Sequence, residues 1–518
     1  MRRALRILGW GLLTLVLLTL SGWLLADRLT PPATGQPSHA LPVQAAQTEL
    51  DRELAPLLAT QPGKTGAILV PGGLDAFAAR AISARRAGRS LDLQYYIWHD
   101  DLTGRLLGRE AWQAAERGVR VRMLLDDMNA EGLDPGLLAL DAHPNLEIRL
   151  YNPFRNRGGM KRVYELVQRV VSVNHRMHNK AWIADGRMAV VGGRNIGVEY
   201  FDAGEDTNFR DLDLVLFGPA VAQASSVFDA YWNSTAAVPI AALSRKDPKQ
   251  LQALMAQVEA EAASPAAQRY LQRVEASKQV RAYFAGSLQP RWSEGVRVVA
   301  DPPLKWQSDD RSGWMVEQLT AKLRGAQRKA LLISPYFVPG EFGTDGLGAL
   351  ATRGVHVGVI TNSLAANDVP AVHSGYARYR EPLLAAGVRL YEIRAQGRPE
   401  TAGIFGSSGA SLHTKAFVVD DARGFVGSFN LDPRSADLNT EMGVLFDDPV
   451  IASELRDEYL RLASPALSYW VYRRPDGALR WLDRAAQPPL LLDHEPDTSR
   501  MQRATATVAG WLPIESQL

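Results

Sequence analysis

The chain has no cysteine among its 518 residues and only nine histidines. Without cysteine there can be no disulfide, no cysteine-ligated zinc, no thiol nucleophile and no lipoprotein anchor. The formal net charge is only +2, so the chain lacks a global nucleic-acid signature and any basic surface must be local. With 46% hydrophobic and 22% charged residues, the composition is typical of a globular protein, long enough for two or three domains.

Two of the histidines belong to one repeated pattern, His-x-Lys followed after four residues by Asp. The residues between Lys and Asp are mainly apolar, as in a buried strand, so the His and Lys of each copy project from the same face. Small residues and an asparagine follow each copy and let the backbone and an amide come close to a ligand. The copies are His178, Lys180, Asp185 and Asn195, and His413, Lys415, Asp420 and Asn430.

The residue types of this pattern suit phosphodiester chemistry. A lone His-x-Lys is usually a core histidine beside a lysine that reaches water, but two copies with matching followers indicate a site. Protonated lysine has no lone pair and no further ligand stands at a suitable spacing, so we predict neither a metal nor a cofactor. Two imidazoles and two ammonium groups supply a nucleophile, a proton for the leaving alkoxide and positive charge for the non-bridging oxygens. The two copies should therefore face each other across one pocket.

The paired motifs resemble those of the phospholipase D superfamily, and the likeness extends to other segments. It implies an α/β fold of two pseudo-symmetric halves, each a mixed sheet flanked by helices, with one active site between them. It also implies an enzyme that makes cardiolipin by moving a phosphatidyl group onto phosphatidylglycerol through a phosphohistidine, with phosphatidylethanolamine or a second phosphatidylglycerol as donor. The segments similar to bacterial cardiolipin synthases, above all those of the C type, are 91–98, 117–121, 209–213, 361–368, 375–380 and 430–435.

The resemblance also implies roles for the site residues. His178 would be the nucleophile and His413 the general acid, whereas Lys180, Lys415, Asn195 and Asn430 would hold the phosphoryl oxygens. The carboxylates that orient the histidines would be Asp211 after the first copy and Glu441 after the second, with Asp213 as the alternative to Asp211. Asp185 and Asp420 complete the motifs, but their odd spacing from the histidines suits a structural role.

Three functions from different classes are compatible with this site. The first is phosphatidyl transfer, and the second is hydrolysis by a phospholipase D or, less readily, a nuclease, because water can replace the acceptor. The third is a membrane-tethered binding protein without catalysis, which two intact motifs argue against. The expected partners are phospholipid substrates and a membrane, without nucleic acid. A helper protein is a further partner that the sequence neither requires nor excludes.

The N-terminal segment contains an uncharged, leucine-rich run, Ile7 to Ala26, with arginines before it and a tryptophan near each end. Its length is enough to span a bilayer, so we predict one transmembrane helix, with a cleaved signal peptide as the alternative. Arginines before the run keep the N-terminus cytoplasmic, which places the catalytic body on the periplasmic side of a bacterial cytoplasmic membrane. Thr30 to Gln47 is rich in proline and small polar residues and is typical of a tether.

Each half shows the same order of strand, helix and strand, at 91–97, 106–117 and 119–125 and again at 329–337, 347–353 and 355–360. Asp75 is expected to cap an earlier helix. The predicted divisions are a transmembrane anchor (1–28), a flexible tether (29–60), the first half (61–240), a helical connector (241–290), the second half (291–460) and a C-terminal extension (461–518).

Two further segments leave alternatives open. Residues 155–176 combine six basic residues with apolar residues on one helical face. They form either an ordinary surface helix with a core-facing stripe or an interfacial helix that inserts this face among lipids. In the extension, 469–472 and 479–482 flank Pro475-Asp476-Gly477 as a hairpin, which either packs onto the second half or belongs to a separate binding module.

Overall fold

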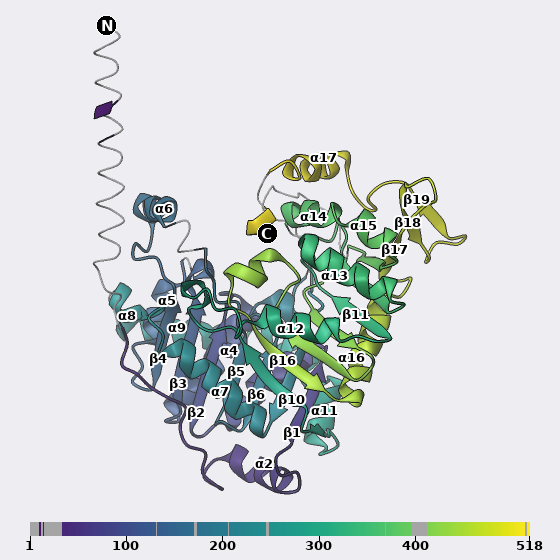
Figure 1. The fold of residues 1–518 in the computed structure, drawn as a ribbon. Helices are drawn as coiled ribbons and strands as arrows, with labels where there is room; N and C mark the ends of the chain where they lie inside the picture. The colour runs from purple at the N-terminus through teal and green to yellow at the C-terminus, as the bar shows by residue number, and fades with distance from the viewer. Residues whose placement is uncertain are drawn as a thin grey trace.

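The computed structural model describes residues 34–130, 132–169, 174–205, 207–244, 248–367, 369–395, 412–512 and 515–518, together with residues 10, 11 and 14. Over these residues the chain forms two mixed β-sheets with helices on their faces (Figure 1). The predicted α/β architecture of two similar halves is confirmed.

The first half is built on a sheet with nine strands among the described residues, in the order β8-β4-β3-β2-β5-β6-β7-β1-β9. β2, β3 and β4 are parallel and linked by helices, whereas β5, β6 and β7 alternate in direction. Its strands are β1 (Thr65–Val70), β2 (Ser90–Tyr95), β3 (Arg120–Asp126), β4 (Leu146–Tyr151), β5 (Ala181–Ala184), β6 (Met188–Gly192), β7 (Asp213–Phe217), β8 (Ala237–Pro239) and β9 (Arg291–Ser293). Its helices are α2 (Glu49–Ala59), α3 (Gly73–Arg86), α4 (Leu102–Glu116), α5 (Asp134–Leu140), α6 (Gly159–Gln168), α7 (Pro219–Trp232) and α8 (Ile240–Leu243).

The second sheet repeats this topology, because β13-β12-β11-β14-β15-β16 corresponds to β4-β3-β2-β5-β6-β7. β11, β12 and β13 are again parallel, and β14 again runs antiparallel to the strand before it in the sheet. The strands are β10 (Val296–Ala300), β11 (Lys329–Ile333), β12 (His356–Asn362), β13 (Arg389–Ile393), β14 (Lys415–Val419), β15 (Arg423–Gly427), β16 (Met442–Asp447), β17 (Ser468–Arg473), β18 (Leu479–Asp483) and β19 (Leu490–Leu492). The helices are α12 (Met315–Arg324), α13 (Gly340–Thr352), α14 (Pro370–Ala377), α15 (Arg380–Ala385), α16 (Pro449–Leu462) and α17 (Arg500–Ala509).

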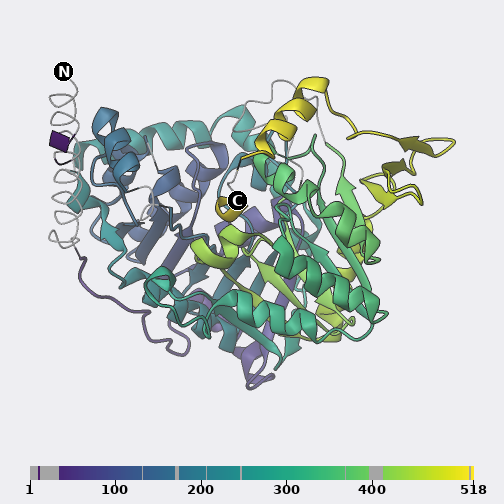
Figure 2. The same cartoon turned by 45° about the horizontal axis from the view of Figure 1, so that its top comes forward.

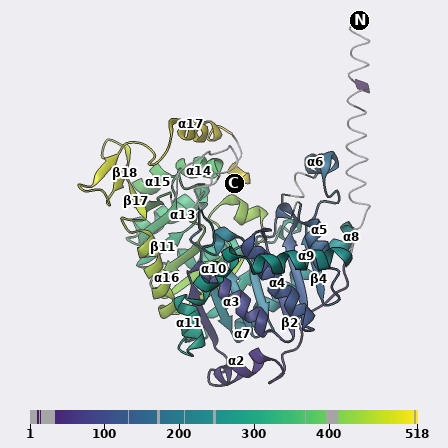
Figure 3. The same cartoon turned by 180° about the vertical axis from the view of Figure 1, so that it is seen from behind.

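The two sheets share one apolar core. Residues of both sheets, among them Leu214 and Val444, pack with α7 and α16 in a single buried cluster. Separate clusters lie under α3 and α4 in the first half and under α12, α13 and α15 in the second. Figure 2 and Figure 3 show these outer helices on opposite sides of the molecule. The halves are therefore joined face to face, which brings corresponding strand ends together.

Most predicted elements exist, but several begin or end elsewhere. The helix predicted at 106–117 is α4, which starts earlier because the Asp101 carboxylate caps it and accepts a hydrogen bond from the Gly104 N–H at 2.9 Å. The prediction that Asp75 caps a helix is wrong, since α3 begins at Gly73 and Asp75 lies in its first turn. The strand predicted at 329–337 ends at Ile333, just before Pro335, which has no N–H for the sheet.

The prediction of a flexible tether over 29–60 is wrong for much of this range. The Ser38 and Ala40 N–H groups donate hydrogen bonds to Asn233 and Asp229 at the end of α7, at 3.0 and 2.8 Å. The Gln36 carbonyl accepts a hydrogen bond from the buried Arg149 guanidinium at 2.6 Å. Residues 49–59 form α2, which buries its apolar face and is capped by Thr48. Backbone groups of the segment thus satisfy buried polar groups of the first half, which composition does not reveal.

The region between the halves consists of three consecutive helices, α9 (Pro248–Ala262), α10 (Pro265–Glu275) and α11 (Lys278–Phe284). The guanidinium of Arg109 in α4 forms an ion pair with Glu259 of α9 at 2.7 Å, and the Tyr270 ring of α10 lies edge-on to Phe77 of α3. These helices therefore cover the outer face of the first half.

The C-terminal extension continues the second sheet. β17 and β18 form the predicted hairpin, and β17 pairs with β13. Of the two alternatives for this segment, packing onto the second half is confirmed.

The predicted membrane span, Ile7 to Ala26, lies outside the described residues apart from residues 10, 11 and 14. Among the helices in the described part of the chain, none has both the length and the apolar character needed to cross a membrane.

Candidate active site

In both halves the motif histidine lies just before a strand, at the edge of the sheet where the parallel strands end. β5 and β14 run antiparallel to β2 and β11, so the residues just before them lie where the parallel strands end. His178 and Lys180 precede β5, and Lys415, two residues after His413, opens β14. All four side chains are buried or nearly so, and the facing packing of the halves brings the two copies together, as the repeat predicts.

His178 is held by a carboxylate from the other half. Its ring Nδ1 lies 2.8 Å from Glu441 Oε2 and 3.1 Å from the Ser428 carbonyl oxygen. The Ser428 hydroxyl donates a second hydrogen bond to Glu441 Oε2. With a proton on Nδ1 shared with Glu441, the opposite nitrogen, Nε2, keeps its lone pair for a ligand.

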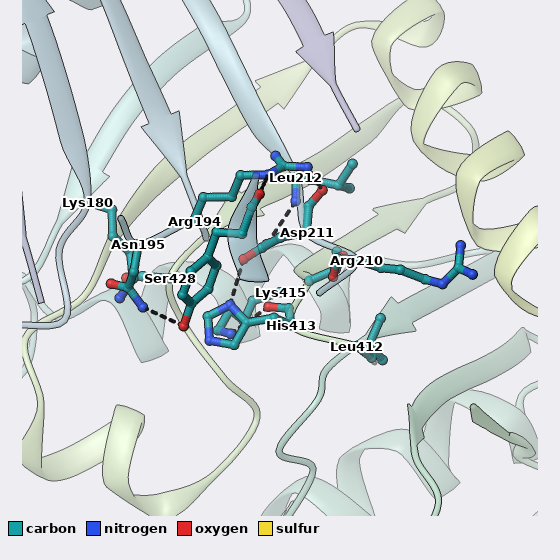
Figure 4. A network of polar contacts seen from close by, with 12 residues as sticks. Lys180, Arg194, Asn195, Arg210, Asp211, Leu212, Leu412, His413, Lys415 and Ser428 are labelled. Carbon is teal, nitrogen blue, oxygen red and sulfur yellow. Dashed lines mark hydrogen bonds and ion pairs between the residues drawn. The ribbon is translucent and has the colours of Figure 1, made fainter. Parts of the chain in front are cut away.

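His413 has the same arrangement with the halves exchanged. Its Nδ1 lies 2.6 Å from Asp211 Oδ2, and the second Asp211 oxygen accepts a hydrogen bond from the Leu212 N–H at 2.8 Å (Figure 4). Asp213, the alternative carboxylate, does not contact this histidine and instead pairs with Arg80 at 3.0 Å. Each imidazole is therefore oriented by a carboxylate that the opposite half supplies.

Backbone hydrogen bonds between the halves hold each histidine next to the carboxylate of the opposite half. The His178 N–H donates to the Thr440 carbonyl at 2.8 Å, and the His413 N–H donates to the Arg210 carbonyl at 2.8 Å. The residue next to each acceptor is the orienting carboxylate, Glu441 or Asp211. The same short stretch thus positions both the histidine backbone and its ring.

The two lysines adopt matching conformations. Lys180 Nζ donates a hydrogen bond to the His178 carbonyl, and Lys415 Nζ donates one to the His413 carbonyl, each at 2.5 Å. Lys180 also lies over the Tyr96 ring, 5.3 Å from its centroid. Both lysines are buried, each 1% exposed, so an anion between their ammonium groups would meet concentrated positive charge.

Burial and charge lower the proton affinity of the site. Burial lowers the pKa of His178 to about 4, with Lys180 and Lys415 adding to the effect against the opposing pull of Glu441. Burial, Lys415 and Lys180 also lower the pKa of His413 well below its usual value. Burial lowers the pKa of Lys180. A bound phosphate would offset these positive charges, because its negative charge favours the protonated forms.

The two asparagines differ in what they contact. The Asn195 oxygen accepts a hydrogen bond from the Ile97 N–H at 3.2 Å, and its amide donates to the Tyr200 hydroxyl at 3.0 Å. The Asn430 side-chain oxygen has no hydrogen-bond partner in the described part of the chain. Figure 4 shows Asn195 beside Lys180, to the left of His413. Asn195 therefore holds the Tyr200 ring, which borders His413.

Asp185 and Asp420 lie at the far ends of β5 and β14, away from the imidazoles. The Asp185 carboxylate accepts hydrogen bonds from the backbone N–H groups of residues 88 to 90, at 2.7 to 3.2 Å. Asp420 does the same for residues 327 to 329, at 2.8 to 3.2 Å. Both adopt left-handed backbone conformations, with φ of 54° and 55°. These contacts fix the starts of β2 and β11.

Sequence reasoning missed residues that hold the segment before each histidine. Asp126, at the end of β3, accepts hydrogen bonds from the Met177 N–H at 2.9 Å and from Arg176 at 3.1 Å. Asn362, at the end of β12, exchanges two hydrogen bonds with the backbone of Leu412. Both follow the carboxyl ends of parallel strands, a position that the strand pattern could have indicated.

Aromatic rings border both imidazoles. The Tyr96 ring lies edge-on to His178, with centroids 5.0 Å apart. Tyr200 lies edge-on to His413 at 5.2 Å, and Phe209 stacks on it at 5.6 Å. The rings limit the orientations of both histidines.

Known proteins share these features. A family model described as "Cardiolipin synthase, PLD-like domain" matches residues 82–232 and 319–463, one segment in each half. The chain is 39% identical over 477 residues to cardiolipin synthase C of Escherichia coli (strain K12), which covers 89% of this chain and 98% of that protein. It is 27% identical over 381 residues to a cardiolipin synthase of Staphylococcus aureus (strain Mu50), covering 73% and 63%.

The fold also has a solved counterpart. The crystal structure of phosphatidylserine synthase from Haemophilus influenzae Rd KW20 matches with a TM-score of 0.57 and 13% sequence identity, over 90% of this chain and 99% of that chain. At this identity the likeness concerns the fold alone.

Proposed function

The chain belongs to the phospholipase D-like family of cardiolipin synthases, and from this premise we propose that it moves a phosphatidyl group onto the glycerol hydroxyl of phosphatidylglycerol. The product is cardiolipin, and the donor is phosphatidylethanolamine or a second phosphatidylglycerol. The observation that carries this proposal is the pair of buried histidines, each oriented by a carboxylate of the opposite half. Such a pair brings together two imidazoles whose Nδ1 atoms are held by carboxylates, which leaves each Nε2 for the reaction.

In the first step His178 Nε2 attacks the phosphorus of the donor. A P–N bond forms as the P–O bond to the departing alcohol breaks, and protonated His413 gives its proton to the leaving oxygen. Glu441 stabilises the positive charge that develops on the His178 ring. The intermediate is a phosphatidyl group on His178, with His413 neutral.

In the second step the acceptor hydroxyl replaces the alcohol. His413 takes the proton from the hydroxyl of phosphatidylglycerol, whose oxygen attacks phosphorus while the P–N bond breaks. His178 is released as a neutral imidazole and His413 is again protonated, so the site returns to its starting state. Lys180, Lys415, Asn195 and Asn430 hold the non-bridging oxygens in both steps.

Hydrolysis is the second candidate function, because water in place of the acceptor would turn the same intermediate into a phospholipase D product. The extended likeness to cardiolipin synthases favours transfer, since it covers both halves and the segments between the motifs.

We also propose that Ile7 to Ala26 anchors the enzyme in a bacterial cytoplasmic membrane, with the catalytic body on the periplasmic side. The support is the row of arginines before the run and its leucine-rich, uncharged composition. A reporter that folds only outside the cytoplasm, fused after Gln47, should be active. Activity from a cytoplasm-only reporter at that position would reverse the orientation.

The function can be tested by lipid analysis of cells that lack their own cardiolipin synthases. Expression of the wild-type chain should restore cardiolipin, and expression of the His178→Ala variant at the same level should not. Accumulation of phosphatidic acid without cardiolipin would instead establish the hydrolase.

A further inference from the structure

Helix α6 turns its apolar face away from the protein. Met160, Val163 and Tyr164, which lie three and four residues apart on one face of the helix, are 81%, 52% and 61% exposed. A surface helix of a soluble protein usually has the opposite orientation, with its apolar stripe toward the core.

The charged side of α6 is the buried side. Glu165 accepts hydrogen bonds from the N–H groups of Arg155 and Asn156, at 2.9 and 2.8 Å. The buried Arg162 guanidinium lies over the Phe154 ring, 4.4 Å from its centroid. These contacts fix the orientation of the helix, so the exposed apolar face is a built feature of the fold. Of the apolar residues that favoured a core-facing stripe over 155–176, Val163 is exposed, whereas Leu166, Val167, Val170 and Val171 lie outside the described side chains.

Helix α17 and the turn after it repeat this feature in the second half. Met501 and Val508 are 75% and 54% exposed, and Trp511 and Leu512 follow at 77% and 50%. Met501 and Val508, seven residues apart, lie on one face of the helix, and Trp511 and Leu512 lie in the turn after it. The other side rests on α14, where the Ser374 hydroxyl donates to the Ala506 carbonyl at 2.6 Å.

Both helices stand on the side of the molecule that carries the catalytic loops. α6 lies in the connection that leads from the end of β4 to His178, and α14, which supports α17, follows the end of β12. Figure 1 and Figure 3 both show α6 and α17 at the same end of the molecule, opposite α11.

The last residues of the chain link the two catalytic loops on this side. The Asn174 amide donates to Gln517 at 2.5 Å, and the Arg434 N–H donates to the Leu518 carbonyl at 2.8 Å. Asn174 lies just before His178, and Arg434 lies just after Asn430. The two apolar faces therefore lie on the side of the molecule where the chain end contacts both loops.

The charge around the two faces suits anionic lipids. Arg155 is exposed just before α6, and Arg500 is exposed at the first position of α17. Neither helix has an acidic residue in its first turn. Exposed apolar side chains bordered by arginines are typical of helices that lie in the headgroup region of anionic bilayers.

From these observations we propose that the exposed faces of α6 and α17 dock the catalytic side of the protein onto an anionic phospholipid bilayer, one face from each half. This proposal rests on the proposed function only in its choice of a lipid surface over a second copy of the chain, because the substrates reside in the bilayer. Docking at two separated points would hold the catalytic side against the membrane. Phospholipids could then pass from the bilayer to the site without crossing water.

The absence of cysteine allows a local test in the full-length chain. Single cysteines introduced as V163C, W511C or F284C, in the inactive His178→Ala background, are labelled with an environment-sensitive fluorophore. Phe284 is the matched control, since it is 63% exposed and ends α11 at the opposite end of the molecule. The protein is reconstituted into vesicles of phosphatidylethanolamine and phosphatidylglycerol, with or without brominated acyl chains.

The labels at 163 and 511 should shift to the blue and be quenched by brominated lipid, whereas the label at 284 should remain in water. Equal water exposure at all three positions would overturn the proposal. Protection of 163 and 511 without quenching by lipid would also overturn it, because a second copy of the chain would then cover the faces. Since the background is inactive, the readout stands or falls independently of cardiolipin synthesis.

A second experiment measures kinetics after the exposed apolar side chains are replaced by aspartate. The double variant V163D/W511D should lower turnover of long-chain substrates in vesicles about tenfold or more, since both anchors are lost. It should leave turnover of short-chain phospholipid dispersed in detergent unchanged, and F284D should change neither. An equal loss on both substrates would show damage to the catalytic site and contradict the docking role.

Discussion

The two motif histidines have the same scaffold but different surroundings. Glu441 faces His178, and although burial alone would raise its pKa, His178, Lys180 and the Ser428 hydroxyl lower it and keep it ionised. Asp211 faces His413, and burial raises its pKa despite the nearby Lys415. A firmly ionised partner suits a ring that gains positive charge during attack. A partner with a raised pKa suits a ring that exchanges a proton in each step. We therefore keep the roles that the resemblance implies, His178 as the expected nucleophile and His413 as the expected acid, and test them below.

The largest effects should come from neutralising the two carboxylates. E441Q and D211N should each lower kcat about 10²- to 10⁴-fold, because each removes the negative charge beside the ring and introduces an amide N–H that can donate to Nδ1 and favour the wrong histidine tautomer. With a phosphatidyl donor whose leaving group is p-nitrophenol, D211N should recover much of the rate of p-nitrophenol release in the first turnover, since that leaving group needs no proton, whereas the second step still needs His413 as a base. E441Q should not recover, because attack by His178 is still impaired.

Asp213 provides the control for this comparison. It is as buried as Asp211 and two residues away, but it pairs with Arg80. D213N should therefore reduce stability without any dependence on the leaving group. Recovery of E441Q rather than D211N with the p-nitrophenyl donor would exchange the assigned roles.

The proton affinity of the site should depend on its charge. In the free protein the pKa of His178 is lowered to about 4 and that of His413 is lowered in the same direction. Both rings should stay neutral as the pH falls through 6.5, where histidines of the unfolded chain take up protons. A step that needs neutral His178 is lost only when the pH falls below the lowered pKa of His178. A step that needs protonated His413 is lost when the pH rises above the pKa of His413.

NMR titration of the histidine rings can measure this shift directly. Inorganic phosphate should raise the pKa of His413, because it offsets the charge of Lys415 and Lys180. The K180M variant should raise it without phosphate. Titration of both rings near 6.5 in the free wild-type protein would contradict the charge balance described for the site.

The smallest effect on catalysis is expected for the motif aspartates. D185N should lower the free energy of unfolding by about 1–3 kcal/mol, because a fully buried carboxylate that accepts three backbone hydrogen bonds is altered. D420N should cost less, since Asp420 is partly exposed. Urea unfolding measures both, and kcat per folded molecule should change little. A loss of kcat by orders of magnitude at unchanged stability would show that the aspartates act in catalysis.

Much of this site could be predicted because it is repeated. The two His-x-Lys copies and the order of strand, helix and strand appear twice in the sequence, so each half supports the interpretation of the other. The exchange of Asp211 and Glu441 between the halves could not be predicted, because spacing along the chain does not show which half supplies a partner. The packing of residues 36–40 onto the first half was also not predicted. These residues are held through their backbone groups, which form hydrogen bonds with Arg149, Asn233 and Asp229. The apolar face of α6 points outward because Glu165, on the other face, accepts hydrogen bonds from residues 155 and 156. The period of the apolar residues does not show which face of the helix is buried.

The central claim is that His178 carries the phosphatidyl group and His413 moves the proton. It is tested most directly by incubating H413A and H178A with a phospholipid donor and locating any covalent adduct by mass spectrometry of the digested protein. A donor with a p-nitrophenyl ester allows the first step to proceed in H413A, because p-nitrophenolate leaves without being protonated. A phosphatidyl adduct on His178 in H413A, with none in H178A, is the predicted result. An adduct on His413 in H178A, with none in H413A, would contradict the account and reverse the two roles.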